Sequence, residues 1–499
     1  MATSTIGTFL QRVKARLNTV KARNTLLGAH LVLLIGAFLL GHTEAPDQAT
    51  YYALADGLAQ GSYSVWNGIL DPSPVDLLRT HGYPVFLMLV RSISKNPTLL
   101  FACQSILHVL TILLLLRFIG SGPEGHLRQS FFLLLLLPQF QLVYYAHQVF
   151  PETLMATMGI SFVLLITDPI RSILRTVLLG LLAAAIFWVR PVMLFFPLFI
   201  LLLDLVFAAG SLRWPLLRRN AAMMTIALVF GPLAFGWWNL KAHGVFKPIP
   251  LSGSSVNSNL GIWQLRLPGY GTMHYFQYNY FGREVLPLVS DDEAAAFYTA
   301  YEDQWERIET EAARSMTEVD VRNMPVMAEH RTELYATRSP AYTMALDDVI
   351  GKENKQMIQD EPLYYLGTRL YAAVRLWVTN INLPMEKVVY EPTPGVRPKV
   401  GRPNGLSGWA SALVPFLITF FTFGIGIPLL LGSVIGSLRR RTGRWAPWRY
   451  ALYMIGYVWV VHVPMSIQSR YTVPVHALAI ACIALLLAGA MSRRVERAV

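Results

Sequence analysis

Long apolar runs separated by polar connections dominate the chain. Ten of them are candidate spans, and most have about the 17–25 residues that are needed to cross a ~30 Å hydrocarbon layer. They lie near 25–41, 97–119, 129–145, 151–167, 173–189, 191–208, 221–238, 408–436, 450–465 and 471–491. The pattern predicts an all-α polytopic membrane protein with about 10–13 transmembrane helices.

The composition supports this class. Apolar residues make up 54% of the 499 residues and charged residues 14%, whereas a soluble domain carries about 25% charged residues. The net charge of +12 would suit a nucleic-acid partner, but the basic residues lie mainly between the apolar runs. We therefore expect the lipid bilayer as a partner and no nucleic acid.

Arginine is concentrated in every second connection. After the basic N-terminus, these connections contain Arg117 and Arg128; Arg171 and Arg175; Arg213, Arg218 and Arg219; Arg439, Arg440, Arg441, Arg444 and Arg449; and Arg493, Arg494 and Arg497. The intervening connection 144–150 has no Lys or Arg, so the positive-inside rule places both termini in the cytoplasm. The sequence has no Asn-x-Ser/Thr sequon, which favours a bacterial inner membrane.

This topology divides the chain into four segments. They are a cytoplasmic N-terminus, 1–24; a transmembrane module, 25–238, with a first external loop at 42–96; a periplasmic region, 239–407; and a C-terminal transmembrane bundle, 408–499. In the periplasmic region, 290–321 and 339–359 predict charged helices. The segment 362–384 mixes Arg with Tyr and Trp, which predicts a helix that lies in the membrane interface.

Ionisable residues gather at the predicted non-cytoplasmic ends of the spans. Asp47 follows the first apolar run, and RTHGYPVFL supplies Arg79 and His81 on the same side. The other such residues are Glu152, Arg190, Lys241, His243 and Arg470. Ionisable groups at the membrane boundary are costly and usually functional. Their convergence suits a site where cations hold a lipid-linked phosphate and a carboxylate takes a proton from an acceptor.

In order along the chain, these residues resemble the polytopic GT-C glycosyltransferases, which include protein O-mannosyltransferases and lipid A aminoarabinose transferases. The matching residues are Asp47, Tyr51, Ala55 and Gly61; Arg79 with GYPVFL; Pro151-Glu152; Val189-Arg190-Pro191; Trp238-Asn239; and Arg470-Tyr471. The resemblance covers most of the chain. The external region matches little beyond Pro362 and Arg375-Leu376-Trp377.

The resemblance implies an inverting hexosyl- or pentosyltransferase with an active site on the periplasmic face. Its donor would be a polyprenyl-phosphate sugar and its acceptor a glycolipid, a cell-envelope glycan or a protein, with Asp47 as the general base. Many relatives have a second acid directly after the first, where this chain has Gln48. Glu44 or Glu152 would then supply the second carboxylate. We place Arg79, His81, Tyr51, Arg190, Lys241, His243 and Arg470 among the substrate-binding residues.

Each candidate also has a plainer interpretation. Asp47 could cap the helix that follows, Arg190 could be a span end that snorkels to the surface, and Glu152 could be a solvated acid in a first helical turn. The two histidines could be structural. No cluster has metal-ligand spacing, so no metal ligand is predicted, and a divalent cation stays open as a cofactor.

Two other functions compete with this interpretation. A lipid-linked sugar flippase would place ionisable residues near the midplane, on broken helices and often in repeated halves, whereas here they lie at one face. A GT-C-like ligase or polymerase would use a diphosphate-linked donor instead of a monophosphate.

The topology gives a first testable prediction. Cysteine introduced as Ala300→Cys should react with a membrane-impermeant maleimide in intact cells, and Arg440→Cys should react only after the membrane is opened. The opposite labelling pattern would contradict the prediction that Asp47 and Arg470 share the external face of the membrane.

Overall fold

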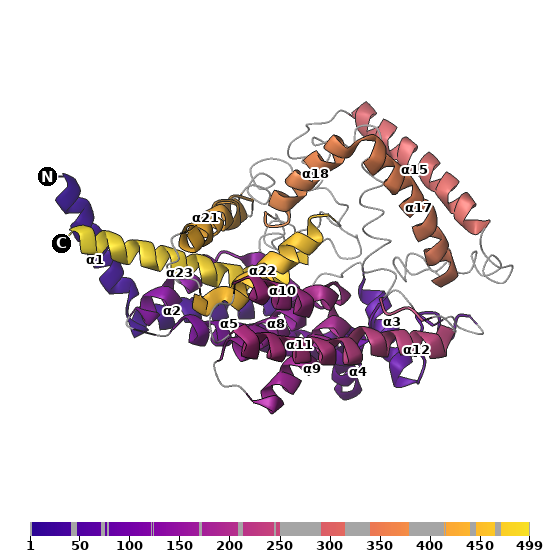
Figure 1. Ribbon diagram of the computed structural model, residues 1–499, viewed down its shortest axis with the longest axis horizontal. Helices are drawn as coiled ribbons and strands as arrows, with labels where there is room; N and C mark the ends of the chain where they lie inside the picture. The colour runs from indigo at the N-terminus through magenta and orange to yellow at the C-terminus, as the bar shows by residue number, and fades with distance from the viewer. Residues whose placement is uncertain are drawn as a thin grey trace.

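The structure is a computed structural model. It describes residues 2–40, 47–70, 75–76, 79–120, 122, 124–168, 172–207, 213–243, 246–249, 291–314, 340–378, 414, 416–439, 446–464 and 471–498. Every regular element in these ranges is a helix (Figure 1). The predicted all-α class is therefore confirmed for the described part of the chain.

The first half of the chain forms a compact set of helices. They are α1 (Ala2–Leu17), α2 (Val20–Leu39), α3 (Gln48–Ala59), α4 (Gly82–Ile93), α5 (Pro97–Ile119), α6 (Gly125–Leu136), α7 (Phe140–Ala146), α8 (Glu152–Thr167), α9 (Ile173–Val189), α10 (Phe196–Phe207), α11 (Arg213–Leu228) and α12 (Ala234–His243). Three of them begin at side-chain caps that the sequence supplies, because Thr19, Asn96 and Ser172 accept hydrogen bonds from the first turns of α2, α5 and α9.

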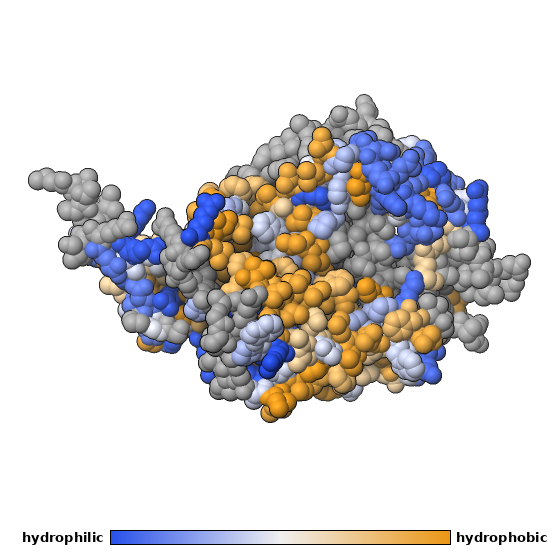
Figure 2. Space-filling view, viewed as in Figure 1, coloured by the Kyte–Doolittle hydropathy of each residue, from blue (hydrophilic) through white to orange (hydrophobic). Residues whose placement is uncertain are grey.

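Several helices have the length and apolarity of membrane spans. Among the described residues, five qualify: Val20–Leu39, Pro97–Ile119, Trp214–Ala242, Phe416–Arg439 and Val473–Glu496. A bent pair of helices would be a sixth, and four shorter apolar helices accompany them. The protein is thus a multi-pass membrane protein, while the full predicted number of spans stays a prediction. Figure 2 shows the broad apolar surface that these helices expose.

Several predicted spans are not regular α-helices, and prolines mark the irregular positions in two of them. The span predicted at 129–145 is divided into α6 and α7, which meet at 75° around Pro138, a residue that cannot continue the backbone hydrogen bonding of α6. The span predicted at 221–238 extends over Trp214–Ala242. It contains a π-helical segment, Val229–Leu233, with Pro232 inside it.

The C-terminal bundle completes the core of the first module. Its helices are α21 (Gly426–Arg439), α22 (Arg449–His462) and α23 (Val473–Ala498). α23 packs against α5, α6, α8 and α22, and its buried side chains share one hydrophobic cluster with those of α5, α8 and α9. The two transmembrane segments that are separate in sequence therefore fold around a common core.

Among the described residues, three helices outside this core belong to the predicted periplasmic region. They are α15 (Asp291–Ala313), α17 (Pro340–Asp360) and α18 (Pro362–Arg375), so both predicted charged helices are present. Arg307 on α15 pairs with Glu353 on α17 at 2.6 Å. α18 is joined to the end of α22, because the Tyr365 hydroxyl donates to the Pro464 carbonyl oxygen at 3.2 Å.

The arrangement in Figure 1 separates the two ends of the bundle. The termini, with α1 and the end of α23, lie at one end, whereas α3 and the end of α12 lie at the other. The charged helices α15 and α17 stand away from the bundle and form the hydrophilic region of Figure 2. The candidate residues of the first external loop therefore lie far from the termini.

Candidate functional site

Asp47 is paired with Arg79. Asp47 occupies the residue before α3 but makes no side-chain capping hydrogen bond. Its Oδ1 instead accepts a hydrogen bond from an Arg79 guanidinium nitrogen at 3.1 Å, and the exposed fractions of the two side chains are 13% and 17%. The interpretation of Asp47 as a side-chain cap is therefore wrong, and its carboxylate pairs with Arg79 instead.

The loop around Arg79 is fixed by two further hydrogen bonds. The backbone N–H of Arg79 donates to Asp76 Oδ1 at 2.9 Å, and its carbonyl oxygen accepts from the Tyr63 hydroxyl at 3.0 Å. Burial lowers the pKa of the Arg79 guanidinium, but the Asp47 carboxylate, acting together with Tyr51, Asp76 and Tyr63, outweighs this effect and raises the pKa above its ordinary value. Arg79 is thus a permanent cation in a preformed position.

A second carboxylate–guanidinium pair joins α8 to α9. Glu152, the first residue of α8, is only 1% exposed and accepts a hydrogen bond from the Arg190 guanidinium. Arg190 ends α9 in an extended conformation, as expected for a residue before a proline. The interpretations of Glu152 as a solvated acid and of Arg190 as a freely snorkelling residue are therefore both wrong.

Tyr51 contacts Arg79 and is within electrostatic reach of both pairs. The Arg79 guanidinium is 4.8 Å from the centroid of the Tyr51 ring. Burial raises the pKa of the Tyr51 hydroxyl, and the charges of Arg79, Asp47, Arg190 and Glu152 act on it with opposing signs. We call these five residues, Asp47, Tyr51, Arg79, Glu152 and Arg190, the outer charge cluster.

A close backbone contact holds the two halves of this cluster together. Gly82, at the start of α4, lies against the end of α9, and a Cβ atom at this position would be 2.5 Å from the carbonyl carbon and oxygen of Trp188. Only glycine permits this approach. The contact brings the loop that carries Arg79 beside the chain segment that ends in Arg190.

The outer charge cluster has hydrogen-bonding groups that its protein contacts leave unused. Within the described part of the chain, Arg79 Nε, Arg190 Nε and Glu152 Oε2 are buried and have no hydrogen-bond partner. Guanidinium N–H groups bind phosphate well because their planar geometry matches two oxygens. The cluster can therefore offer two cations to an anionic ligand next to a carboxylate.

His81 has surroundings that differ from those of the other candidates. Its ring stacks on Tyr63 with centroids 3.8 Å apart and meets the edge of Trp238 at 4.2 Å. Burial lowers the pKa of the imidazole to about 4, so the ring is neutral at neutral pH. His81 supports the loop of Arg79 as part of an aromatic cluster and does not supply a second cation there.

The remaining candidates are only partly placed. Lys241 is exposed on α12, with its ammonium nitrogen 5.3 Å from the centroid of the Trp237 ring. Glu44, Arg470 and the side chain of His243 lie outside the described residues. Among the described residues, no group of three or more His, Cys, Asp or Glu side chains could hold a metal ion.

Two residues that contact the outer charge cluster were given no role from the sequence. Tyr471 lies 5.4 Å from the Arg190 guanidinium, measured to the ring centroid, and stacks on His462 with centroids 5.1 Å apart. Asp76 positions the backbone of Arg79. The Arg-Tyr pair at 470–471 was a usable signal for Tyr471, whereas nothing in the sequence around Asp76 distinguishes it from an ordinary loop acid.

Comparison of the chain with protein-family models and with curated proteins gives no match. Among solved structures, it is similar to ArnT from Cupriavidus metallidurans bound to undecaprenyl phosphate, with 13% identity, a TM-score of 0.35 and coverage of 94% of this chain and 77% of that chain. It is also similar to the archaeal oligosaccharyltransferase AglB from Archaeoglobus fulgidus, in complex with an inhibitory peptide and a dolichol-phosphate. For AglB the identity is 13% and the TM-score 0.41; 94% of this chain matches 52% of that chain, or about half its length. TM-scores below 0.5 describe a loose likeness, so the function proposed for this chain rests on its own residues.

The Gly82 contact generates a testable prediction. Gly82→Ala should destabilise the protein by about 1–3 kcal/mol, the usual cost of overpacking, because the new methyl group meets backbone atoms that cannot rotate away. Thermal unfolding of the purified protein in detergent measures this. Gly36→Ala on α2 is the matched control, since a Cβ there meets nothing within 4 Å. Equal melting temperatures for the two variants would contradict the tight junction.

Proposed function

We propose that this chain is an inverting membrane glycosyltransferase. It would transfer a sugar from a polyprenyl-phosphate donor to a hydroxyl group of a glycolipid, cell-envelope glycan or protein on the periplasmic side of the inner membrane. One observation carries the proposal: a carboxylate, Asp47, and two guanidinium groups, Arg79 and Arg190, gather around Tyr51. This is the combination that proton removal and phosphate binding require.

The proposed reaction is a single displacement. Asp47 accepts the proton of the acceptor hydroxyl while the acceptor oxygen forms a bond to the anomeric carbon of the sugar. The bond between that carbon and the phosphate oxygen breaks, and polyprenyl phosphate leaves with the electron pair. Guanidinium groups stabilise the negative charge that the departing phosphate gains. The displacement inverts the anomeric configuration.

The two ion pairs suit different roles in this reaction. Arg79 stabilises Asp47 as an anion, the form that a general base needs. Arg190 is the proposed phosphate ligand, since its Nε is unused among the described contacts. Glu152 is buried against Arg190, so we assign it the role of orienting that arginine. Arg470 is the second proposed phosphate ligand on sequence grounds alone.

The base assignment is tested by a neutral isostere. Asp47→Asn should fold and bind donor, yet lose transfer by about 10²–10⁴-fold, the usual contribution of a general base. The measurement is sugar transfer by the purified enzyme in lipid, with a polyprenyl monophosphate donor and with a diphosphate donor in parallel. Asp56→Asn is the matched control, because Asp56 lies on α3, the helix that follows Asp47, and likewise pairs with an arginine, Arg91, at 2.8 Å.

The outcomes of this assay separate the competing functions. Transfer from the monophosphate donor supports the proposal, and transfer only from the diphosphate donor supports a ligase or polymerase. Movement of intact lipid-linked sugar without transfer supports a flippase. Full activity of a correctly inserted Asp47→Asn protein would exclude Asp47 as the base.

The phosphate assignment gives a separate prediction. Arg190→Ala and Arg470→Ala should each weaken donor binding by about 10- to 100-fold, the effect of losing one charged hydrogen bond worth about 1.5–3 kcal/mol. Replacement by lysine should restore binding only in part, because lysine lacks the planar fork. Donor titration measures the change. Arg307→Ala, at an exposed ion pair of α15, is the control; unchanged donor affinity in both alanine variants would place the phosphate elsewhere.

A further inference from the structure

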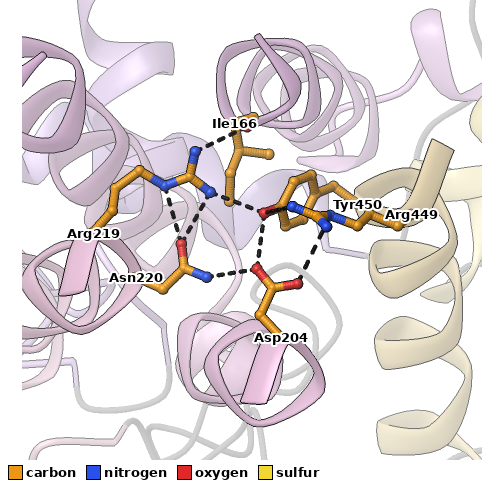
Figure 3. Close-up of polar contacts among 6 residues, drawn as sticks. All are labelled: Ile166, Asp204, Arg219, Asn220, Arg449 and Tyr450. Atoms are coloured by element: carbon orange, nitrogen blue, oxygen red, sulfur yellow. Dashed lines mark hydrogen bonds and ion pairs between the residues drawn. The ribbon is translucent and has the colours of Figure 1, made fainter. Parts of the chain in front are cut away.

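A second polar cluster lies within the bundle, at the Arg-rich ends of its helices. It contains Asp204 on α10, Arg219 and Asn220 on α11, and Arg449 and Tyr450 at the start of α22 (Figure 3). Asp204 and Asn220 are fully buried. We call these five residues the inner polar node.

Hydrogen bonds hold the inner polar node in a defined geometry. Asp204 Oδ2 accepts from Asn220 Nδ2 at 2.7 Å and from the Tyr450 hydroxyl at 2.8 Å. The Tyr450 oxygen in turn accepts from Arg219 at 2.9 Å and from Arg449 at 2.8 Å. Figure 3 shows Tyr450 between the two arginines, above the Asp204 carboxylate. One tyrosine hydroxyl therefore fixes both guanidinium groups.

The charges within the node do not balance. Two guanidinium groups face one carboxylate, and a buried excess charge is costly unless a counter-charge accompanies it. Arg219 is well satisfied, since it also donates to the Ile166 carbonyl oxygen and to Asn220 Oδ1. Arg449 makes fewer hydrogen bonds to the described residues. Its Nε is 3.8 Å from Asp204 Oδ1, beyond hydrogen-bond distance, and its side chain is 30% exposed. The excess positive charge thus lies on the accessible side of the node.

The two chain segments that precede Arg219 and Arg449 add positive charge and no negative charge. Arg213 and Arg218 precede Arg219, and Arg439, Arg440, Arg441 and Arg444 precede Arg449. The segments 205–220 and 401–449 contain neither Asp nor Glu. An anion that approaches Arg449 therefore meets no Asp or Glu side chain from these two segments.

The aromatic residues next to the node are of the kind that is enriched at the depth of lipid headgroups. Trp214 on α11 is 69% exposed, and Trp448, directly before Arg449, packs edge-on against Phe118 with centroids 4.5 Å apart. Exposed Trp residues mark the membrane–water interface. Trp214 is five residues before Arg219, about 8 Å along the helix.

We propose that the inner polar node binds the phosphate of an anionic phospholipid from the leaflet at the Arg-rich end of the bundle. Arg449 supplies the main contact to the phosphate, and Tyr450 and Asp204 position it. Basic pockets between transmembrane helices on the cytoplasmic side are a recognised form of lipid site. This site is separate from the proposed transfer reaction, because α8 carries Glu152 at its first turn and the Arg219 contact, Ile166, at its last, about 21 Å away along the helix.

The test measures lipid retention. The purified full-length protein is exchanged into nanodiscs of phosphatidylcholine with increasing phosphatidylglycerol, and the retained phosphatidylglycerol is counted by native mass spectrometry. The wild type should retain this lipid, and Arg449→Gln should bind it at least about tenfold more weakly, because a charged hydrogen bond is lost. Arg218→Gln is the matched control: it removes the same charge from an exposed side chain on α11 and should change retention little.

Other results of this experiment would overturn the proposed lipid site, and two additional measurements complete the test. Equal losses in the two glutamine variants would overturn the site in favour of diffuse attraction, and unchanged retention in both would make the node purely structural. If Arg449→Gln does not fold, Arg449→Lys provides the test, since it keeps the charge but should retain less lipid than the wild type. Inorganic phosphate that competes as well as phosphatidylglycerol would assign the site to a free anion and overturn the lipid.

Discussion

The close packing of α23 is the constraint on which the other helices depend. Between helices in a bilayer there is little hydrophobic driving force, so stable association needs small side chains that let backbones approach. α23 contains buried alanines at 477, 479, 481, 484 and 488, and a Cβ atom on Gly426 of α21 would be 2.7 Å from Ile483. The position of α23 is therefore fixed closely. Tyr471, just before it, is fixed as well, and with it the ring beneath Arg190.

The depth of burial distinguishes the two carboxylates of the outer charge cluster. Each is paired with an arginine that also lies over an aromatic ring, Tyr51 for Arg79 and Tyr471 for Arg190. As whole residues, Glu152 is 1% exposed and Asp47 9%, so loss of the Glu152 carboxylate would leave a cation unpaired at the more deeply buried pair, which is strongly destabilising. In the proposed reaction, this difference supports the positioning role of Glu152 and the role of Asp47 as the base.

The sequence predicted the class of the protein and most of its helices because apolar runs are local features. It also selected Asp47, Arg79, Glu152 and Arg190, since charge at a span end is unusual. It could not predict how these residues pair, because their partners are 32 and 38 residues apart in the chain and meet only after folding.

Other features were present in the sequence but carried an ambiguous signal. Pro138 was visible within 129–145, yet bilayer helices tolerate proline, so the bend between α6 and α7 did not follow from it. Asp204 stood alone in an apolar run, and Arg219 and Arg449 were already explained as topology signals. Their meeting at Tyr450 required the packing of α10, α11 and α22.

The length of α8 has a consequence for the membrane itself. Glu152 lies at its N-terminal end, where the helix dipole favours an anion, and Arg175 and Arg219 bind the carbonyl oxygens of Leu165 and Ile166 at its other end. Its 16 residues span only about 24 Å, less than the ~30 Å of a typical hydrocarbon core. The charged groups at the two ends of α8 are thus closer together than the two faces of an undisturbed bilayer. Because α8 packs against α5, α9, α22 and α23, water or lipid headgroups reach these groups only by entering the ends of the bundle, by a total of about 6 Å. For the donor phosphate of the proposed reaction, this implies a position deeper than that of the neighbouring phosphates in the same leaflet.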